Sequence, residues 1–442
     1  MWKIINNIVA TKPISHSKIN GVLDVHGNVV VEPKKIGNVM NKNFVSIADD
    51  LIKKRTHVAC DYDKFSIGSV KNGFVFKNIS ASKIENYIKT MNPNKSVRSD
   101  VPSIRFVKLS AKIISPYLSM LYNSCVEYGV FPNSLKHAEV VPIYKNGKKN
   151  NVNNYRPISL LSPFSKIFES LVCERLSGYF LSNNLLHCKQ YGFRKNSTTE
   201  LAVNQIVEEL IEAGEKKKVN CSVFLDLAKA FNTVNHKILI SKLKCYNIKC
   251  SMLNFINSYL KDRSQSTVVN NVVSEREILN VGIPQGSCFG PLLFLVYIND
   301  IFSATNIKLR LFADDACLSY QHCDIDHVNV VINMELKKID EWLCKNRLFI
   351  NYSKTKFLLF NRTAKKNEFS VKVNGFVIEQ SENIKYLGVV LDDNLNWKAH
   401  LKYLKSKLSR SCFMMSKLRY YLDTSTLKMV YYSLFYPHIL YC

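Results

Sequence analysis

The spacing of apolar and polar positions along the chain predicts a mixture of helices and strands. Helical spacing recurs at residues 39–51, 81–91, 112–122, 166–180, 198–213, 236–243, 251–260 and 328–345. Strand-length apolar patterns mark residues 138–143, 219–227, 267–273, 277–281 and 349–360, and two short strands surround a turn within residues 308–320. A glycine-punctuated loop at residues 282–290 opens an apolar helix that runs to residue 301. This intermixing favours an α+β fold.

The two ends of the chain differ from this regular middle. Residues 1–110 mix polar stretches with two of the helical patterns, and a loop rich in Asn, Pro, Lys and Ser at residues 91–101 separates them from the rest. Near the other end, an apolar stripe predicts one helix over residues 398–422, whose charged residues are all basic. Because a solvated helix face usually mixes signs, this face suits a phosphate backbone, and an amphipathic membrane helix is the alternative.

Composition adds a strong charge bias. The 442 residues include 61 Lys and Arg against 35 Asp and Glu, a formal net charge of +26. This excess predicts a polyanionic partner, either nucleic acid or an anionic membrane, against the alternative of an unusually basic soluble enzyme. By length we expect two or three domains, or one large catalytic unit.

Several patterns bear on the compartment. No run of 18 or more apolar residues predicts a membrane span, and the start of the chain does not resemble a signal peptide. The 13 cysteines form no C-x-x-C pair. They therefore favour reduced core residues in an intracellular protein of the nucleus, the cytoplasm or both, without a membrane partner.

Three carboxylates carry the candidate chemistry. Asp226 closes an apolar strand, and the pair Asp314 and Asp315 occupies the turn between two further apolar strands. Adjacent carboxylates in apolar surroundings repel each other and are costly to desolvate, and a divalent cation resolves both problems. Brought together, the three residues would form an oxygen-ligand site for two Mg²⁺ ions, with Mn²⁺ as an alternative, of the kind that clamps a phosphoryl transfer. The competing interpretation of Asp314 and Asp315 is an ordinary polar β-turn.

Seven short motifs follow one another along the chain: VPIYK at 141–145, NYRPISLL at 154–161, QYGFR at 190–194, LDLAKAF at 225–231, GIPQGS at 282–287, FADD at 312–315 and YLG at 386–388. In this order they resemble the reverse transcriptases of non-LTR (LINE-type) retrotransposons, particularly the jockey-like group. The resemblance implies a right-hand polymerase fold, with helical fingers, a palm built on an antiparallel sheet and the start of a helical thumb. It divides the chain into an N-terminal extension (1–110), a reverse transcriptase domain (123–391) and the start of a truncated thumb (392–442).

The resemblance also implies a reaction and its central residues. The chain would use an RNA template and a DNA primer, whose 3′-hydroxyl attacks the α-phosphate of a dNTP. Asp226, Asp314 and Asp315 would be the catalytic metal ligands. Lys354 would protonate the departing pyrophosphate, with a plain surface lysine as the alternative.

Further residues match positions that hold the substrates. Lys145 and Arg156 correspond to cations that grip the triphosphate, for which the planar fork of arginine is well suited. Phe231 corresponds to an aromatic gate against a 2′-hydroxyl, with a core phenylalanine as the alternative. The pair Gln285 and Gly286 corresponds to a loop that touches the template base and the nascent pair.

The last matches concern the primer and the duplex. The motif Tyr386, Leu387 and Gly388 corresponds to a hairpin that steadies the primer end. The basic helix at residues 398–422 corresponds to the first thumb helix, and its lysines and arginines, among them Lys402, Lys405 and Arg410, would follow the duplex.

Some features depart from the family pattern. Asn232 and Asn235 stand where relatives carry Asp, and Cys288 and Phe289 replace the usual Val-Leu. No endonuclease precedes the motifs, and the chain stops within the expected thumb, so the sequence predicts a truncated element copy. The alternative function is therefore a decayed or co-opted copy that binds nucleic acid without catalysis.

Overall fold

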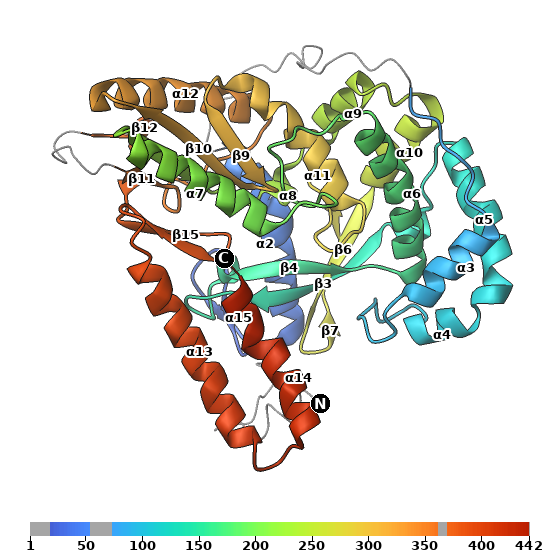
Figure 1. Ribbon diagram of the computed structural model, residues 1–442. Helices are drawn as coiled ribbons and strands as arrows, with labels where there is room; N and C mark the ends of the chain where they lie inside the picture. The colour runs from blue at the N-terminus through green and yellow to red at the C-terminus, as the bar shows by residue number, and fades with distance from the viewer. Residues whose placement is uncertain (1–17, 54–72, 361–368, 442) are drawn as a thin grey trace.

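The computed structural model describes residues 18–53, 73–360 and 369–441 (Figure 1). Its centre is a five-stranded sheet in the order β14-β11-β5-β10-β9. The strands are β5 (Val219–Leu225), β9 (Lys308–Phe312), β10 (Asp315–His322), β11 (Lys356–Phe360) and β14 (Glu379–Gln380). All pairings are antiparallel except that of β14 with β11.

Alternation along β5 directs its side chains into two different buried clusters. Val223 lies in one cluster with residues of α11 (Gly290–Ile298) and α12 (Ile325–Lys345). Its neighbour Phe224 lies in the other cluster with residues of α7 (Thr199–Glu215). The sheet is therefore covered on both faces, which leaves its strand ends as the place where polar groups gather (Figure 1).

A second sheet lies beside the first, with the path β4-β3-β6-β7 and β8 paired to β6. Its strands are β3 (His137–Tyr144), β4 (Tyr155–Leu160), β6 (Arg263–Val269), β7 (Val272–Val273) and β8 (Glu277–Leu279). Helix α2 (Pro33–Lys53) packs on this sheet, and its buried Asn41 donates to the carbonyl oxygens of Gln265 (3.2 Å) and Glu275 (2.8 Å). Residues near the start of the chain therefore complete a sheet built mostly from its middle.

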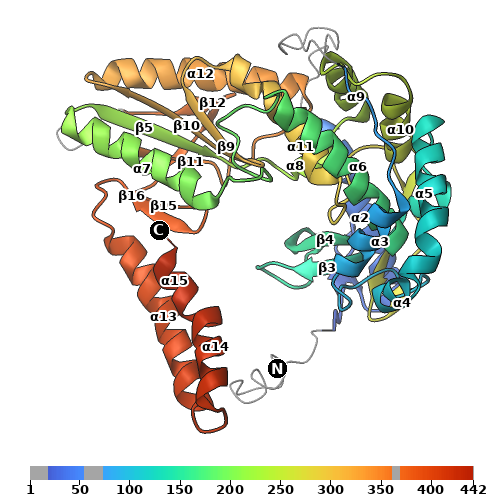
Figure 2. The ribbon, with the colours of Figure 1, turned by 45° about the vertical axis from the view of Figure 1, so that its right-hand side comes forward.

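A helical layer covers the other side of this region (Figure 2). It contains α3 (Ala81–Thr90), α4 (Ile104–Leu109), α5 (Ala111–Glu127), α6 (Pro163–Ser182), α9 (His236–Cys245) and α10 (Cys250–Leu260). The ring of Tyr122 on α5 stacks on Phe168 of α6 at 4.1 Å between centroids, and the Tyr87 hydroxyl of α3 donates to Ser170 at 2.6 Å. The second of these contacts joins residues 73–110 to the body of the protein.

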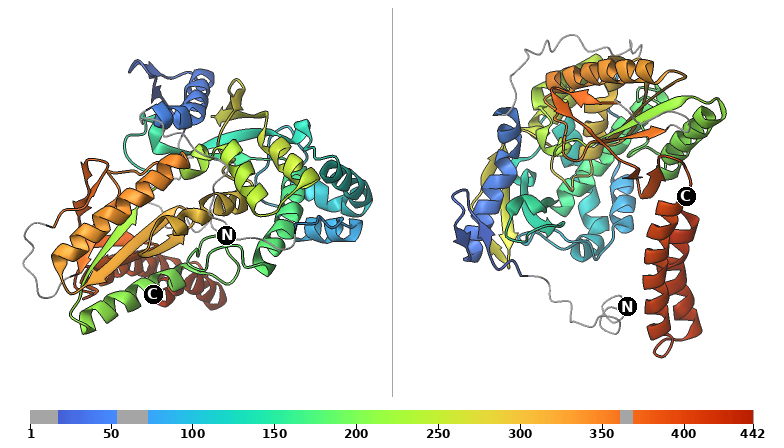
Figure 3. Two further views of the ribbon diagram at one scale, coloured as in Figure 1. Left: turned by 90° about the horizontal axis from the view of Figure 1, so that it is seen from above. Right: turned by 90° about the vertical axis from the view of Figure 1, so that its left-hand side faces the viewer.

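The last described residues form a separate arm (Figure 3). A hairpin of β15 (Asn383–Tyr386) and β16 (Val389–Asp392) leads into α13 (Lys398–Leu418), α14 (Thr424–Leu434) and α15 (Tyr436–Leu440). Leu418 and Val430 are the buried centre of the contact between α13 and α14. Packing in this small cluster holds α13 and α14 together as two antiparallel helices (Figure 3).

Short elements connect these layers. They are β1 (Val22–Leu23), β2 (Val29–Val30), α8 (Ala230–Thr233), β12 (Lys372–Val373), β13 (Phe376–Val377) and the 3₁₀ helices Asn133–Leu135, Val152–Asn154 and Asn299–Ala304. In the described residues, no helix is both long and apolar enough to cross a bilayer.

The structure confirms the predicted α+β class and most predicted elements, corrects three of them and adds one strand that was not predicted. Residues 267–273 are not one strand, because Asn270 and Asn271 take positive φ angles and turn the chain between β6 and β7. The strand expected over 349–360 begins only at Lys356. The helix expected over 398–422 ends at Leu418, where α14 packs against it. Strand β4 was not predicted; it contains Pro157 and is an edge strand of its sheet, where proline is tolerated.

Candidate active site

The strand register brings the predicted carboxylates to one end of the central sheet. Strands β5 and β10 are antiparallel, with Leu225 opposite Ala316. One step further, Asp226 follows Leu225 and Asp315 precedes Ala316, so the two carboxylates leave the sheet side by side. Asp314 lies in the two-residue turn that joins β9 to β10. Three residues from two distant segments therefore meet at a single sheet edge.

The electrostatics of this edge disfavour the charged carboxylates. Burial, followed by repulsion from Asp314 and Asp226, raises the pKa of Asp315 to about 6. Burial also raises the pKa of Asp314, with a further contribution from Asp226. Each carboxyl is thus held in the field of another, as expected where a cation is needed for compensation.

Cationic side chains surround the carboxylates. The ammonium Nζ of Lys354 lies 3.9 Å from Oδ2 of Asp226, which also accepts a hydrogen bond from Nδ2 of Asn351 at 2.9 Å. Lys145 and Arg156 are exposed at the ends of adjacent strands. Burial, followed by repulsion from Arg156 and Lys354, lowers the pKa of Lys145, so these cations lie within one another's field.

A fourth cation was not predicted. Lys229 takes a left-handed conformation (φ 51°) just before α8, and burial lowers the pKa of its side chain, followed by repulsion from Lys145, Lys354 and Arg156. Its position three residues after Asp226, inside the LDLAKAF motif, is the sequence signal that could have identified Lys229. Lys229 thus belongs to a group of four neighbouring cations, of which Lys354 contacts Asp226, and such a group suits a negatively charged substrate.

The donor set is of the kind that binds a hard divalent cation. Carboxylate oxygens are the ligands that Mg²⁺ prefers, and the raised pKa values mark carboxylates whose charge lacks compensation. Across the described residues, no group of three His, Cys, Asp or Glu side chains is arranged to hold a metal. The Oδ2 atom of Asp226 contacts Asn351 and Lys354. The residues therefore fit a metal in chemistry and charge, with Asp226 engaged by protein groups.

Phe231 stands beside this edge in a stack of aromatic rings. Its ring lies on that of Phe294 at 4.6 Å between centroids and 20° between planes, and Phe193 meets it edge-on at 6.3 Å. Phe231 is half-buried, with only part of its surface in the core. The ring therefore packs partly in the core, and its role as a sugar gate stays a prediction.

The loop that holds Gln285 and Gly286 is fastened to two neighbouring segments. The carbonyl of Gln285 accepts from the Ser159 amide on β4 at 2.7 Å, and its Nε2 donates to Oδ1 of Asn232 at 2.7 Å. Gly286 has φ 126°, and a Cβ atom there would lie 2.5 Å from the Ser159 carbonyl oxygen. Glycine is therefore required at this crossing, and the unusual Asn232 takes part in it.

The other departures from the family pattern have structural roles of their own. Asn235 caps α9, with its side chain accepting from the amide of Ile238 at 3.1 Å. Phe289 is buried against the ring of Tyr259 at 5.5 Å, so it fills the core. A perturbation of the nascent pair by Phe289 is therefore not expected.

The predicted primer-binding residues form a hairpin turn. Leu387 (φ 45°) and Gly388 (φ 95°) make the turn between β15 and β16, while the ring of Tyr386 is buried against Phe224 at 5.1 Å. The Tyr441 hydroxyl donates to the Leu387 carbonyl oxygen. Tyr386 is thus buried, and the two turn residues are half-buried.

The basic residues expected to follow a duplex lie elsewhere, on the arm. Lys402, Lys405 and Arg410 are exposed on α13. Because the arm projects from the sheets (Figure 3), these cations do not belong to the carboxylate edge.

Comparison with known proteins agrees with this geometry. The reverse transcriptase (RNA-dependent DNA polymerase) family matches residues 145–391, which contain all three carboxylates. The chain belongs to the reverse transcriptase family. Its relatives include the probable RNA-directed DNA polymerase from transposon BS of Drosophila melanogaster, 30% identical over 359 residues, which are 78% of this chain and 39% of the relative.

Two other relatives place this reverse transcriptase chain among mobile elements. The RNA-directed DNA polymerase from mobile element jockey of Drosophila funebris is 27% identical over 74% of this chain and 36% of its own length. The probable RNA-directed DNA polymerase from transposon X-element of Drosophila melanogaster is 28% identical, with the same coverage of 74% and 36%. The predicted resemblance to LINE-type reverse transcriptases is confirmed, and the chain spans less than half the length of these relatives.

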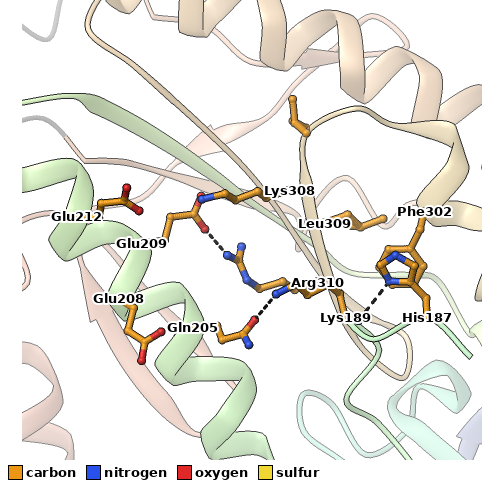
Figure 4. Close-up of a pocket in the computed structure, with 11 residues that line it drawn as sticks. His187, Lys189, Gln205, Glu208, Glu209, Glu212, Phe302, Lys308, Leu309 and Arg310 are labelled. Atoms are coloured by element: carbon orange, nitrogen blue, oxygen red, sulfur yellow. Dashed lines mark hydrogen bonds and ion pairs between the residues drawn. The ribbon is translucent and has the colours of Figure 1, made fainter. Parts of the chain in front are cut away.

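One cavity of this reverse transcriptase chain lies between helix α7 and strand β9 (Figure 4). It has a volume of about 460 Å³ and is lined by residues of α7, β9 and the segment that precedes α7. Glu209 from α7 points at Arg310 from β9, with Lys308 beside them (Figure 4). This buried network supports the hairpin that carries Asp314 and Asp315.

Proposed function

We propose that the chain is an RNA-directed DNA polymerase of a LINE-type retrotransposon, which extends a DNA primer on an RNA template. The observation that carries the proposal is the register of β5 and β10. It sets Asp226 beside Asp315, with Asp314 in the adjoining turn, opposite a group of four cations. Few other reactions need three converging carboxylates and several phosphate-binding cations at one edge.

The proposed architecture is a right hand. The central sheet with α7, α11 and α12 is the palm, and the second sheet with the helical layer around α6 forms the fingers. Residues 123–391 would be the reverse transcriptase domain, and residues 392–442, with α13, α14 and α15, would be the start of the thumb. The hairpin at Leu387 and Gly388 stands between palm and thumb, where a primer end would pass.

Two Mg²⁺ ions would be held by Asp226, Asp314 and Asp315. When bound, such ions polarise the attacking hydroxyl and neutralise charge that develops on the phosphoryl group. The protein contributes the rigid sheet edge that fixes the carboxylates. To bind the ions, Asp226 would exchange its contacts with Asn351 and Lys354 for metal ligation.

The remaining residues would bind and orient the substrates. Lys145, Arg156 and Lys229 would hold the triphosphate, and Phe231 would contact the sugar and exclude a 2′-hydroxyl. Lys354 would supply a proton at the pyrophosphate oxygen as it leaves.

The loop and the arm would position the nucleic acid. The loop at Gln285 and Gly286, held against β4, would support the template base. Lys402, Lys405 and Arg410 on α13 would contact the duplex backbone.

A primer-extension assay tests this proposal. Purified protein is given poly(rA)/oligo(dT), dTTP and Mg²⁺, beside the double variant Asp314→Ala/Asp315→Ala. Asp326→Asn, an exposed aspartate at the start of α12, is the matched control and should retain full activity. Incorporation by the unaltered protein that does not exceed that of the double variant would overturn the proposal.

A further inference from the structure

Residues 189–193, which contain most of the QYGFR motif, lie directly beside the Ala313–Asp314 turn, and Asp315 follows that turn as the first residue of β10. The Leu311 amide of β9 donates to the Lys189 carbonyl oxygen at 3.0 Å, and the Tyr191 amide donates to the Leu311 carbonyl oxygen at 2.8 Å. Gln190 thereby forms a parallel bridge with Leu311. The segment runs beside the edge strand of the central sheet and ends at the carboxylates.

The side chain of Gln190 is hydrogen-bonded to the turn itself. It is 1% exposed, and its Oε1 accepts from the Ala313 amide at 3.0 Å and from the Gly192 amide at 2.8 Å. Ala313 has φ 56°, a left-handed conformation that hairpin turns usually assign to glycine. A non-glycine residue persists in such a conformation only where its surroundings hold it, and the buried amide of Gln190 provides that hold.

Gly192 presses against the same turn. A Cβ atom at this position would lie 2.2 Å from the Ala313 nitrogen and 2.9 Å from its Cα, both rigid backbone atoms. Any side chain at residue 192 would therefore displace the turn. The close approach shows that the segment and the carboxylate turn are packed as one unit.

The next residue reaches the proposed sugar gate. Phe193 (φ 53°) is 58% exposed and meets the ring of Phe231 edge-on at 6.3 Å, while Phe294 stacks on the same ring. The segment thus touches the carboxylate turn through Gln190 and the gate through Phe193.

Hydrogen bonds to helix α7 hold the start of the segment in place. Lys189 donates to Oε1 of Gln205 on α7 at 2.9 Å, and the Tyr191 hydroxyl donates to the same oxygen (Figure 4 shows the first of these bonds). Support from a helix makes the segment a firm base for the two groups that it touches.

We propose that residues 189–193 are a positioning segment that sets the Asp314–Asp315 turn through Gln190 and the Phe231 ring through Phe193. The inference rests on the proposed function, and it adds that metal ligation and sugar selection share one support. Gln190 touches neither substrate nor metal, so it acts through the turn.

The first test compares Gln190→Leu with Gln321→Leu. Gln321 lies at the far end of β10, and its Oε1 has no hydrogen-bond partner among the described residues, so its replacement is a matched control. Gln190→Leu should lower kcat between about 10-fold and about 100-fold and raise the Mg²⁺ concentration for half-maximal activity, because the carboxylates lose their alignment. The KM for template–primer should stay within about twofold, since the proposed duplex contacts lie on α13, away from Gln190.

The conservative variant Gln190→Glu separates positioning from mere packing. Its carboxylate keeps an oxygen that accepts from both amides, so kcat should exceed that of Gln190→Leu. A kcat that matches that of Gln190→Leu would contradict the proposal.

The second test concerns Phe193. Phe193→Ala should raise the use of ribonucleotides relative to deoxyribonucleotides by about fivefold or more, because the Phe231 ring loses one of its supports. An unchanged ratio would remove Phe193 from the proposal.

A readout without catalysis separates this inference from the proposed function. Hydrogen exchange of the peptide over residues 311–316 should quicken about tenfold or more in Gln190→Leu, because the Ala313 amide loses its acceptor, and it should not change in Gln321→Leu. If the unaltered protein is inactive but this exchange difference appears, the proposed function fails and the positioning role stands. If the protein is active and both leucine variants behave alike, the positioning role fails by itself.

Discussion

The most decisive stability prediction concerns the buried network behind the carboxylate hairpin. Glu209 on α7 is 4% exposed and accepts from Nη2 of Arg310 on β9 and from the Ser319 hydroxyl on β10. Arg310, which is equally buried at 4%, also donates Nη1 to Ser319 at 3.0 Å. Lys308 reaches the same carboxylate at 3.2 Å from the exposed end of β9. We therefore expect Glu209→Ala to destabilise the two strands that carry Asp314 and Asp315.

The magnitude follows from the burial of the remaining charge. Removal of Glu209 leaves the Arg310 guanidinium desolvated and without its carboxylate, which typically costs about 3–5 kcal/mol. Ser319 retains one hydrogen bond to Arg310 and offsets only a part of this cost. The double variant Glu209→Leu/Arg310→Met removes both charges, and its loss should be at most about 1 kcal/mol, since apolar groups of similar size replace a buried ion pair with little penalty.

The assay is a double-mutant cycle in urea, read by circular dichroism and by hydrogen exchange of β9 and β10. Glu212→Ala, one turn along the same helix, is the matched control. Glu212 forms an exposed pair with Lys216 at 2.6 Å, so its loss should barely move the midpoint. The reasoning would be refuted if Glu209→Ala behaved like Glu212→Ala, or if the double variant were as unstable as Glu209→Ala.

Three further predictions follow from the site. Phe231→Ala should increase ribonucleotide incorporation relative to deoxyribonucleotide incorporation in competition assays, and a constant ratio would favour a purely structural role for the ring. In EDTA, Asp315→Asn should gain stability over the unaltered protein as the pH rises from about 4 through 6. The Asp315 carboxyl binds a proton more tightly in the folded protein than in the unfolded chain, so loss of that proton at higher pH opposes folding. A difference in urea midpoint between the two proteins that does not vary with pH would contradict this prediction. Replacing the three thumb cations Lys402, Lys405 and Arg410 by Gln should reduce the slope of log affinity against log salt concentration by roughly 2–3. The control Lys112→Gln/Lys337→Gln, at two exposed lysines outside the thumb, should leave this slope unchanged.

Much of the secondary structure could be predicted because it depends on local periodicity. The apolar stripes of α6, α7 and α12 and the apolar run of β5 are readable from the order of residues alone. The failures occurred where tertiary contacts decide. The turn at Asn270 and Asn271 divides an apolar run that otherwise looks continuous. Strand β4 forms although it contains Pro157, because in the described residues β4 is an edge strand that pairs only with β3.

The N-terminal residues illustrate the same limit. Helix α2 was predicted as a helix, but nothing in its own sequence indicates that Asn41 reaches the Gln265 carbonyl of β6. Contacts across such distances in the chain depend on the packing of the whole and leave no local pattern.

For the site, the amino-acid sequence determined which residues carry the chemistry. Asp226, Asp314 and Asp315 stand at the ends of apolar strands, where a charge is too costly to be accidental, and ordered motifs around them identified the family. Only the tertiary structure decided how they meet. The antiparallel register of β5 and β10 sets Asp226 beside Asp315. The buried side-chain amide of Gln190 holds Ala313, in the turn before Asp315, in a conformation that alanine rarely adopts. The physical reason is that residue identity is written locally, whereas register, burial and hydrogen-bond partners exist only after distant segments have packed together.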